Sequence, residues 1–422
     1  MNVLLAGLLI IPFYLIVFGI FFALPVILIW KLFHTWLEYI QKRTFFGQSY
    51  MLLELKLPKD ITRSPVGMEI FFSALFQTAA ATYVETYVGG KIRPSFSLEL
   101  ASFDGAVHFY IYTRKAWRNI IEAQIYAQYP NVEIFEVDDY TRNVVHDPKT
   151  INMWGTQFVF TKPNAYPIKT YIDYGMDKDP KEEFKIDPMT SVLEYLGSLK
   201  PGEQTWIQII IQAHKKIDRK HGKLVGEAIP DWGAAVKAEI KKVREDGVVV
   251  GKDETFRIPN PTRGQTDMIA SMERNLSKLP FEVVIRGFYI TKKEIFNASL
   301  GLSGLIGSFR QYNSMSMNGF KISNKFTDFD DTGKDILTLF GWIWPVGDMA
   351  RWMRDGMEKH MLKMYKWRYA FLQPYHKYNP EPMIMSTEEL ATIYHFPGQV
   401  ATTPTITRST SKKAEPPSNL PI

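Results

Sequence analysis

The hydrophobic positions of this chain begin with an apolar stretch that no charged side chain interrupts. The first thirty residues contain no Asp, Glu, Lys or Arg, and from Val3 to Trp30 almost every residue is Leu, Ile, Phe, Val, Ala or Gly. A helix needs about 20 apolar residues to cross the hydrocarbon core of a bilayer. A cleaved signal peptide would carry a basic n-region and a small-residue cleavage site, and this stretch has neither. The pattern therefore predicts a transmembrane helix over residues 1–32.

Positive charge appears only after this stretch, at Lys31, Lys42 and Arg43. The positive-inside rule then predicts that the N-terminus lies outside and that the bulk of the chain is cytoplasmic. We expect a juxtamembrane helix over residues 33–48, followed by the soluble part of a single-pass protein.

Alternating apolar and polar positions in residues 49–145 predict six elements in the order strand, helix, strand, strand, helix, strand. These elements are expected at residues 50–57, 65–82, 96–103, 107–113, 117–129 and 132–137. Asp104-Gly105 separates the two central strands, and this dipeptide is a strong hairpin signal. The order βαββαβ is that of a ferredoxin-like domain.

The same order of elements recurs in residues 150–330. The second set is expected at residues 157–161, 188–198, 205–212, 281–291, 294–312 and 320–326. An insertion over residues 213–280 separates its middle strands and carries two further helices and a short strand pair. We therefore predict an α+β fold with two tandem ferredoxin-like (βαββαβ) domains, a helical insertion and a C-terminal helical and extended tail.

The pattern changes again in residues 331–380. Methionines recur at helical spacing between Arg and Lys residues, at positions Met349, Met353, Met357, Met361 and Met364. This spacing predicts an amphipathic helix that packs on the domains, while its tryptophans and basic residues would also suit a membrane interface. Residues 381–422 are assigned to a partner-binding motif and a flexible tail, because the Pro/Ser/Thr-rich sequence after residue 401 has no periodicity.

The composition excludes several kinds of chemistry. The chain has 422 residues, a formal net charge of +6 and no cysteine, so disulfide frameworks, thiolate nucleophiles, Cys-type zinc sites and iron–sulfur clusters are ruled out. No G-x-x-x-x-G-K-[ST], H-E-x-x-H or G-x-S-x-G string occurs. The glycine-rich run from Gly301 to Ser308 lies in a predicted helix, where small residues indicate close packing. We expect a protein that is not an enzyme and that holds no cofactor or metal.

A compact basic cluster opens the insertion, with Asp218 as its one acidic member. The cluster consists of Lys215, Lys216, Arg219, Lys220 and Lys223. Two interpretations are open, a solvated surface and a contact with nucleic acid or anionic lipid. Aromatic positions on the predicted strands could also stack bases, but the RNP1 pattern is missing and a core role is favoured for Phe96, His108, Tyr110 and Tyr112.

The chain contains three strings that together resemble a known family. They are "LELKLPKDITRSPVGMEIFFSAL", "SLELASFDGAVHFYIYTRKAWRNIIEAQIYAQYPNVEIFEVDDYT" and "STEELATIYHFPGQVATTPTITRSTSKKAEPPSNLP". They resemble the region that precedes the motor in bacterial conjugative DNA-transfer ATPases, the coupling proteins of type IV secretion. The resemblance covers most of residues 50–421, and the last string is its most specific part. In that string Ser386 is placed to cap a short helix with Glu389, and Pro397 ends the helix.

The resemblance implies a membrane-anchored accessory half without the motor, because no phosphate-binding residues are present to carry over. It implies a scaffold at the bacterial cytoplasmic (inner) membrane that docks a separate secretion or DNA-transfer ATPase; the alternative is a membrane-tethered nucleic-acid-binding module. The expected partners are the lipid bilayer and that ATPase, with DNA and a second copy as further candidates. Partner binding is assigned to Glu388, Glu389, Tyr394, His395, Phe396 and Pro397. Deleting residues 384–422 is then expected to release the partner and leave the domains folded.

Overall fold

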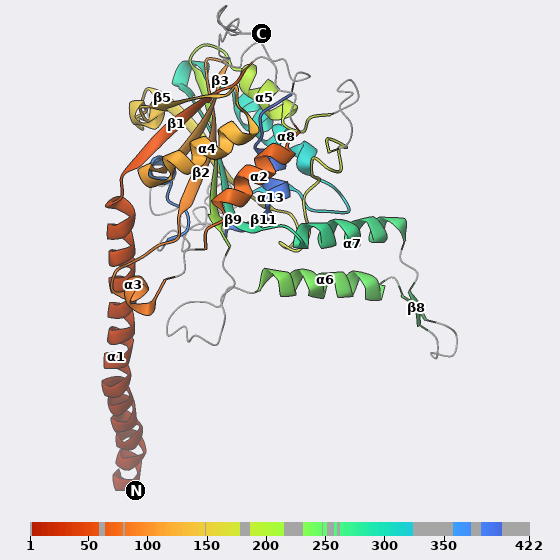
Figure 1. Ribbon diagram of the computed structural model, residues 1–422. Helices are drawn as coiled ribbons and strands as arrows, with labels where there is room; N and C mark the ends of the chain where they lie inside the picture. Colours follow the sequence, from red (N-terminus) through yellow and green to blue (C-terminus); the bar gives the residue numbers. More distant parts are fainter. Residues whose placement is uncertain are drawn as a thin grey trace, which may run out of the picture.

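The computed structural model describes residues 2–58, 64–78, 81–147, 149–177, 186–214, 231–246, 248–250, 257–259, 262–323, 358–372 and 381–398. The chain begins with α1 (Asn2–Phe46), a single helix of 45 residues that joins the predicted transmembrane and juxtamembrane helices without a break. Within α1, the segment Phe21–Phe46 is long and apolar enough to cross a membrane. Figure 1 shows α1 projecting from the body with the N-terminus at its far end.

Within the described part of the chain, nine strands form one antiparallel sheet in the order β10-β5-β9-β6-β2-β3-β1-β4, with β11 also paired to β9. The strands are β1 (Tyr50–Lys56), β2 (Ser95–Phe103), β3 (Ala106–Arg114), β4 (Glu133–Val137), β5 (Ile151–Phe160), β6 (Glu203–Ala213), β9 (Pro280–Lys292), β10 (Phe320–Ile322) and β11 (Met383–Ser386). The Asp104-Gly105 hairpin is confirmed, since both residues have positive φ and Phe103 pairs with Ala106.

The two predicted sets of strands meet at the centre of this sheet. β2 pairs with β6 over its whole length, from Ser95 opposite Gln212 to Phe103 opposite Gln204. On one side of this seam the order is β2-β3-β1-β4, and on the other it is β6-β9-β5-β10. Counted outward from the β2–β6 pair, each half of the sheet therefore contains the strands of its set in the same order: second, third, first and fourth.

Helices cover one face of the sheet and share a single hydrophobic core with it (Figure 1). They are α2 (Val66–Leu75), α4 (Arg118–Gln128), α5 (Thr190–Gly197), α8 (Leu305–Ser308) and α13 (Thr387–Ile393). The helix expected at 65–82 ends early, and α3 (Tyr83–Tyr87) forms separately beside α1. The helix expected at 294–312 is also wrong: a π-helical turn (Ser299–Gly304), α8 and short 3₁₀ turns replace it.

Close packing explains the glycine-rich run. A Cβ on Gly301 would lie 2.1 Å from the Tyr289 ring, and one on Gly304 would lie 2.5 Å from the Tyr195 ring. The interpretation of these glycines as packing residues is therefore confirmed at both positions.

The helical residues 358–367 cover the opposite face of the sheet. Met361, Leu362 and Tyr365 pack with Trp206 and Phe288 in a second hydrophobic cluster. The described part of the predicted amphipathic segment thus packs on the body, whereas Met349, Met353 and Met357 lie outside the described residues, as does the tail from residue 399. Two of the predicted aromatic positions are core residues on opposite faces of the sheet: Tyr110 is buried in this second cluster, and Phe96 lies in the core under the helices.

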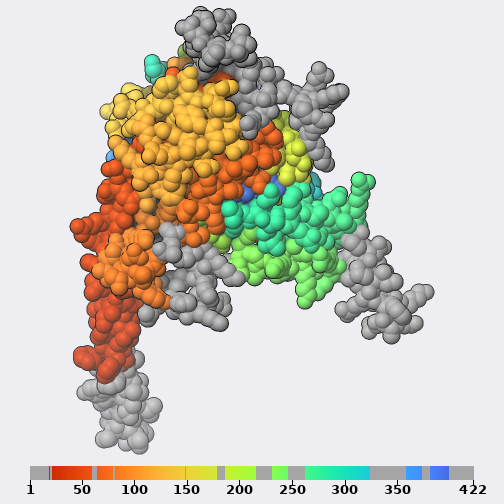
Figure 2. Space-filling model, in the orientation of Figure 1, coloured from red at the N-terminus to blue at the C-terminus, as the bar shows by residue number. Residues whose placement is uncertain are grey.

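The insertion forms an arm made of α6 (Trp232–Asp246) and α7 (Arg263–Leu276), with a small ladder of β7 (Val248–Val250) and β8 (Arg257–Pro259). The two helices lie side by side and stand clear of the sheet, as Figures 1 and 2 show. Their apolar faces bury a separate cluster that includes Val236, Ile240 and Met272. A capping box of Thr262 and Gln265 begins α7.

Candidate functional site

The motif segment, residues 383–398, begins as the sequence predicts. Ser386 caps α13: its Oγ accepts a hydrogen bond from Glu389 N (3.3 Å), and Glu389 Oε2 accepts one from Ser386 N (2.8 Å). This capping box is confirmed. Immediately before it, β11 pairs with β9, with Met383 opposite Val283. The segment therefore enters the sheet as a strand and leaves it as a helix.

The residues assigned to partner binding lie inside the protein. Glu388, Glu389, Tyr394, His395, Phe396 and Pro397 are all buried, and every residue of α13 is buried as well. Phe396 packs against the rings of Tyr129 and Phe109, with centroids 4.7 and 5.9 Å away. A helix that is buried all round belongs to the core of a protein. In this structure the motif segment is therefore not an exposed docking surface.

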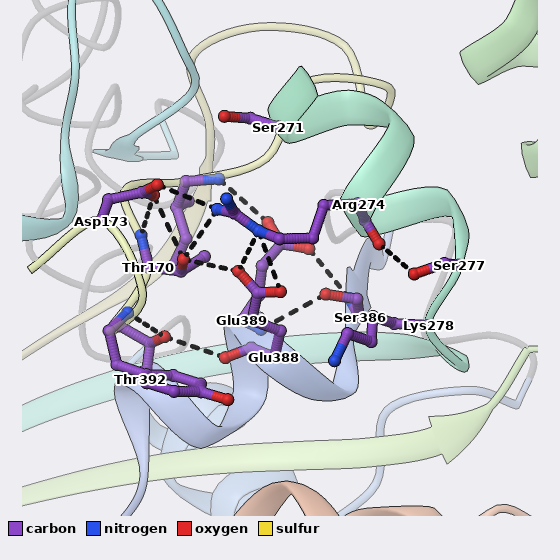
Figure 3. Close-up of polar contacts among 12 residues, drawn as sticks. Thr170, Asp173, Ser271, Arg274, Ser277, Lys278, Ser386, Glu388, Glu389 and Thr392 are labelled. Carbon is purple, nitrogen blue, oxygen red and sulfur yellow. Dashed lines mark hydrogen bonds and ion pairs between the residues drawn. The ribbon is translucent and has the colours of Figure 1, made fainter. Parts of the chain in front are cut away.

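An ion-pair network joins α13 to the arm (Figure 3). Arg274 of α7 donates from Nε to Glu388 Oε1 (3.0 Å) and from Nη2 to Asp173 Oδ1 (2.9 Å). Thr170 Oγ1 donates a hydrogen bond of 2.6 Å to the same Glu388 oxygen. Burial raises the pKa of Glu388, although Thr170 and Arg274 act in the opposite direction. The network holds the base of the arm against the body.

Glu389 is the more deeply enclosed of the two acids. Its Oε1 accepts a hydrogen bond from Ile168 N at 3.0 Å, while its other oxygen serves the capping box. Thr392, one turn further along α13, accepts one from Tyr171 N at 3.0 Å. Burial raises the pKa of Glu389 to about 7, because the two backbone N–H groups offset only part of the cost of removing a carboxylate from water.

His395 makes polar contacts near the end of the motif segment. Its Nε2 lies 3.1 Å from Asp187 Oδ1, and its Nδ1 lies 2.8 Å from the carbonyl oxygen of Ala391. Burial opposes ionisation of Asp187, but the His395 ring and the Met189 N–H keep the pKa of this carboxyl below its usual value. The pair fixes the chain after α13 against the loop that precedes α5.

These groups are used to join parts of the chain. Across the described residues, no group of three or more His, Cys, Asp or Glu side chains is arranged to hold a metal ion. The acids of the motif segment are enclosed and hydrogen-bonded to α7, to residues 168–173 and to the cap of their own helix. Chemically, the arrangement can hold three parts of the fold together and can take up a proton at Glu389.

The predicted basic cluster, Lys215 to Lys223, lies outside the described residues. The residue before it is described: His214 is buried, with Nδ1 3.2 Å from Glu282 Oε1, and is not part of a solvated loop. After the cluster, α6 exposes basic side chains at Lys237, Lys241 and Lys242.

Sequence analysis missed a second polar network, on the face covered by residues 358–367. Arg368 is buried and contacts Glu99 on β2 and Asp139. Tyr140 donates a hydrogen bond of 2.8 Å to the same Glu99 carboxylate. The available signal was Glu99 itself, a charged residue in the middle of the apolar run of β2.

The fold and the motif segment define an α+β protein with a projecting helical arm and an N-terminal helix long and apolar enough to cross a membrane. No family model matches this chain, and none of the curated proteins matches it.

Proposed function

We propose that this protein is a single-pass accessory protein of a type IV secretion or conjugative DNA-transfer apparatus, and that it holds a separate ATPase at the cytoplasmic face of the bacterial inner membrane. The N-terminus lies outside and the body is cytoplasmic, in keeping with the basic residues that follow the apolar stretch. The resemblance of the three strings to coupling proteins supports the apparatus.

The body consists of two ferredoxin-like units in this proposal. The strand order β4-β1-β3-β2 and its counterpart β10-β5-β9-β6 both agree with the split βαβ arrangement, in which every neighbouring pair is antiparallel. The pairing of β2 with β6 covers one edge strand of each unit and joins the two units into a single rigid body.

The observation that best supports the proposal is that α1 continues directly into the body. Phe45, at the end of α1, is buried against Tyr369 with ring centroids 5.4 Å apart, and Phe46 packs on Trp367 at 5.1 Å. The next strand begins at Tyr50, so only three residues separate α1 from the sheet. A helix fused to the body in this way holds a partner at a fixed height and orientation above the membrane, as a scaffold must.

We assign the partner contact to the arm. α6 and α7 stand clear of the sheet, and the ion pairs of Arg274 brace them against the body (Figure 3). The outer face of α6 carries both signs of charge, with Lys241 3.7 Å from Glu245, which suits a polar protein surface.

Photo-crosslinking in cells tests this assignment. A photoreactive residue replaces Ala238 on α6 in one variant and Ala127 on α4 in a matched control; both alanines are exposed on helices. We expect adducts with a secretion or DNA-transfer ATPase at position 238 and not at 127. Adducts at 127 alone would move the contact away from the arm. If neither variant, nor the intact protein purified in mild detergent, yields such a component, the proposed function is wrong.

The rival function is direct binding of nucleic acid by the basic cluster. The basic residues of the sequence favour it, together with exposed Lys237 on α6; Lys241 and Lys242 pair with Glu245 and Glu239. The full-length protein in detergent should then bind DNA at low salt, with an affinity that falls steeply as salt increases and a slope that shrinks when the five cluster residues are replaced by Gln. Lack of binding at low salt would eliminate this function.

A further inference from the structure

α3 contacts α1 at the point where α1 leaves the apolar stretch. The Tyr87 ring lies 5.7 Å from the Phe33 ring, and Trp36 Nε1 donates a hydrogen bond of 3.1 Å to the Tyr87 carbonyl oxygen. Gly89 accepts a hydrogen bond of 3.2 Å from Thr44, higher on α1. Tyr87 therefore lies closer to the N-terminal end of α1 than Gly89 does. Figure 1 shows α3 beside α1, below the sheet.

A close backbone approach fixes this contact. Gly90 has φ +63°, and a Cβ at this position would lie 2.6 Å from the carbonyl oxygen of Ile40. Only glycine adopts this conformation without strain and leaves room for the neighbouring helix. A capping box of Thr82 and Glu85 begins α3. The short helix is therefore seated on α1 in one position.

The exposed side chains of residues 83–88 are mainly apolar, and Glu85, which pairs with Lys91 at 3.1 Å, is the one charged residue among them. Tyr83, Val84 and Val88 are exposed, and no residue of α3 is buried. Beside them, α1 exposes Trp36 and Tyr39. Figure 2 shows α3 as a separate lobe against α1, away from the main body. These five side chains form one apolar and aromatic surface, which we call the collar.

The side of the collar nearest the apolar stretch lies at the depth of lipid headgroups if α1 spans the bilayer, whereas Tyr39, about 13.5 Å beyond Trp30, lies above that layer. The charge-free stretch ends at Trp30, and at a rise of 1.5 Å per residue Phe33 and Trp36 lie about 4.5 and 9 Å beyond it. The headgroup layer of a leaflet is about 5–8 Å thick. Tyr and Trp rings concentrate at this depth because they are apolar with a polar edge. Lys31, exposed on α1, supplies positive charge near the collar, whereas the charge of Lys91 is paired with Glu85.

We propose that the collar inserts into the headgroup region of the leaflet next to the body, so that the protein has a second membrane contact beside α1. The occupant is the lipid surface, because the collar lies next to the apolar stretch of α1, whose exposed residues include Leu28, Trp30 and Leu32. Two contacts restrict the tilt of the body, which a helix alone would allow. This inference rests on the membrane anchoring by α1 but on no particular partner.

Three single-cysteine variants of the full-length protein test the proposal, since the chain has no native cysteine. Val26 in α1, Val84 in the collar and Val145 on the body are replaced by Cys; their exposed fractions are closely matched at 66, 69 and 70%. Val145 precedes β5, whose first residue pairs with Lys292 at the end of the sheet away from α1. Each variant carries an environment-sensitive fluorophore and is reconstituted in bilayers, with and without lipids that bear a headgroup-level nitroxide quencher.

Support for the collar is a blue-shifted emission and loss of fluorescence to the quencher at position 84, with neither at 145. If the fluorophore at position 26 is embedded in lipid and the one at 84 behaves like the one at 145, the proposed insertion of the collar is wrong and the membrane anchoring by α1 is supported. A blue shift at 84 without lipid quenching, together with disulfide formation between two copies of V84C, would assign the surface to a second copy instead. If position 26 itself stays in water, both the anchor and the collar are wrong.

Discussion

Arg368 donates two hydrogen bonds to Glu99, from Nε to Oε1 at 2.9 Å and from Nη2 to Oε2 at 3.0 Å, although 269 positions separate the two residues. The same guanidinium contacts Asp139 and lies over the ring of Tyr112, 4.3 Å from its centroid. This buried pair holds residues 358–372 on the second face of the sheet, next to the contact between Phe45 and Tyr369 that seats α1. It therefore helps to fix the anchor to the body.

Replacing Arg368 by Met should destabilise the protein by about 3–5 kcal/mol, because Glu99 and Asp139 remain buried without their cation. Arg244→Met, which removes an exposed ion pair with Glu273, is the matched control and should cost at most about 1 kcal/mol. Denaturant unfolding of the detergent-solubilised protein measures both. Adding Glu99→Gln to R368M should recover part of the loss. Similar small effects for the two arginines would contradict the structural role of the buried pair.

Glu389 should make stability depend on pH. Burial raises its pKa from 4.5 to about 7, so the folded protein binds this proton more tightly than the unfolded chain. The stabilising contribution is complete below about pH 4.5 and is lost as pH rises through about 7. A shift of this size corresponds to on the order of 3 kcal/mol.

In Glu389→Gln the side chain is neutral at every pH, so this dependence should disappear. The wild type should exceed the variant in thermal stability most at acidic pH, and the difference should shrink toward neutral pH. Thermal unfolding at a series of pH values measures it. Glu245→Gln, an exposed change on α6, should keep the wild-type dependence. Parallel curves for wild type and E389Q would show that Glu389 does not titrate in this range.

Truncation separates the motif segment from the tail. A chain that ends after Gly398 keeps β11, α13 and the buried Phe396, so its melting temperature should match that of the full chain. A chain that ends before Ile384 loses these contacts and should fail to fold or melt far lower. The expectation that residues 384–422 could be removed from an intact body does not agree with the burial of residues 385–397. Equal melting temperatures for the two truncations would show that the segment does not stabilise the body.

Two glycines of one run should respond differently to alanine. Gly301→Ala places a Cβ 2.1 Å from the buried Tyr289 ring and should cost about 1–3 kcal/mol through overpacking. Gly307→Ala meets no atom within 4 Å and lies in α8, so it should be neutral or stabilising by up to about 1 kcal/mol. Chemical denaturation of both variants measures the difference. A loss of stability at Gly307 equal to that at Gly301 would argue against the tight contact with Tyr289.

Local signals in the sequence correctly predicted the elements that depend on neighbouring residues. The apolar stretch predicted α1, Asp104-Gly105 predicted a hairpin, and Ser386 with Glu389 predicted a capping box. The helix expected at 294–312 was wrong in its length and regularity, since residues 299–304 are π-helical and 3₁₀ turns lie at residues 293–295 and 310–312. Helical periodicity in the sequence does not distinguish a π-helical turn from an α-helix.

The sequence by itself determined an apolar helix able to span a membrane, an α+β body and most of its strands, because hydrophobic periodicity and turn chemistry act over a few residues. The tertiary structure decided where the charged residues lie. In the sequence, Glu388 and Glu389 look like the polar face of an exposed helix. In the structure both are buried, because Glu388 pairs with Arg274, 114 positions away, and Glu389 accepts a hydrogen bond from the Ile168 N–H. A buried charge needs a partner, and that partner comes from whichever segment the fold brings near.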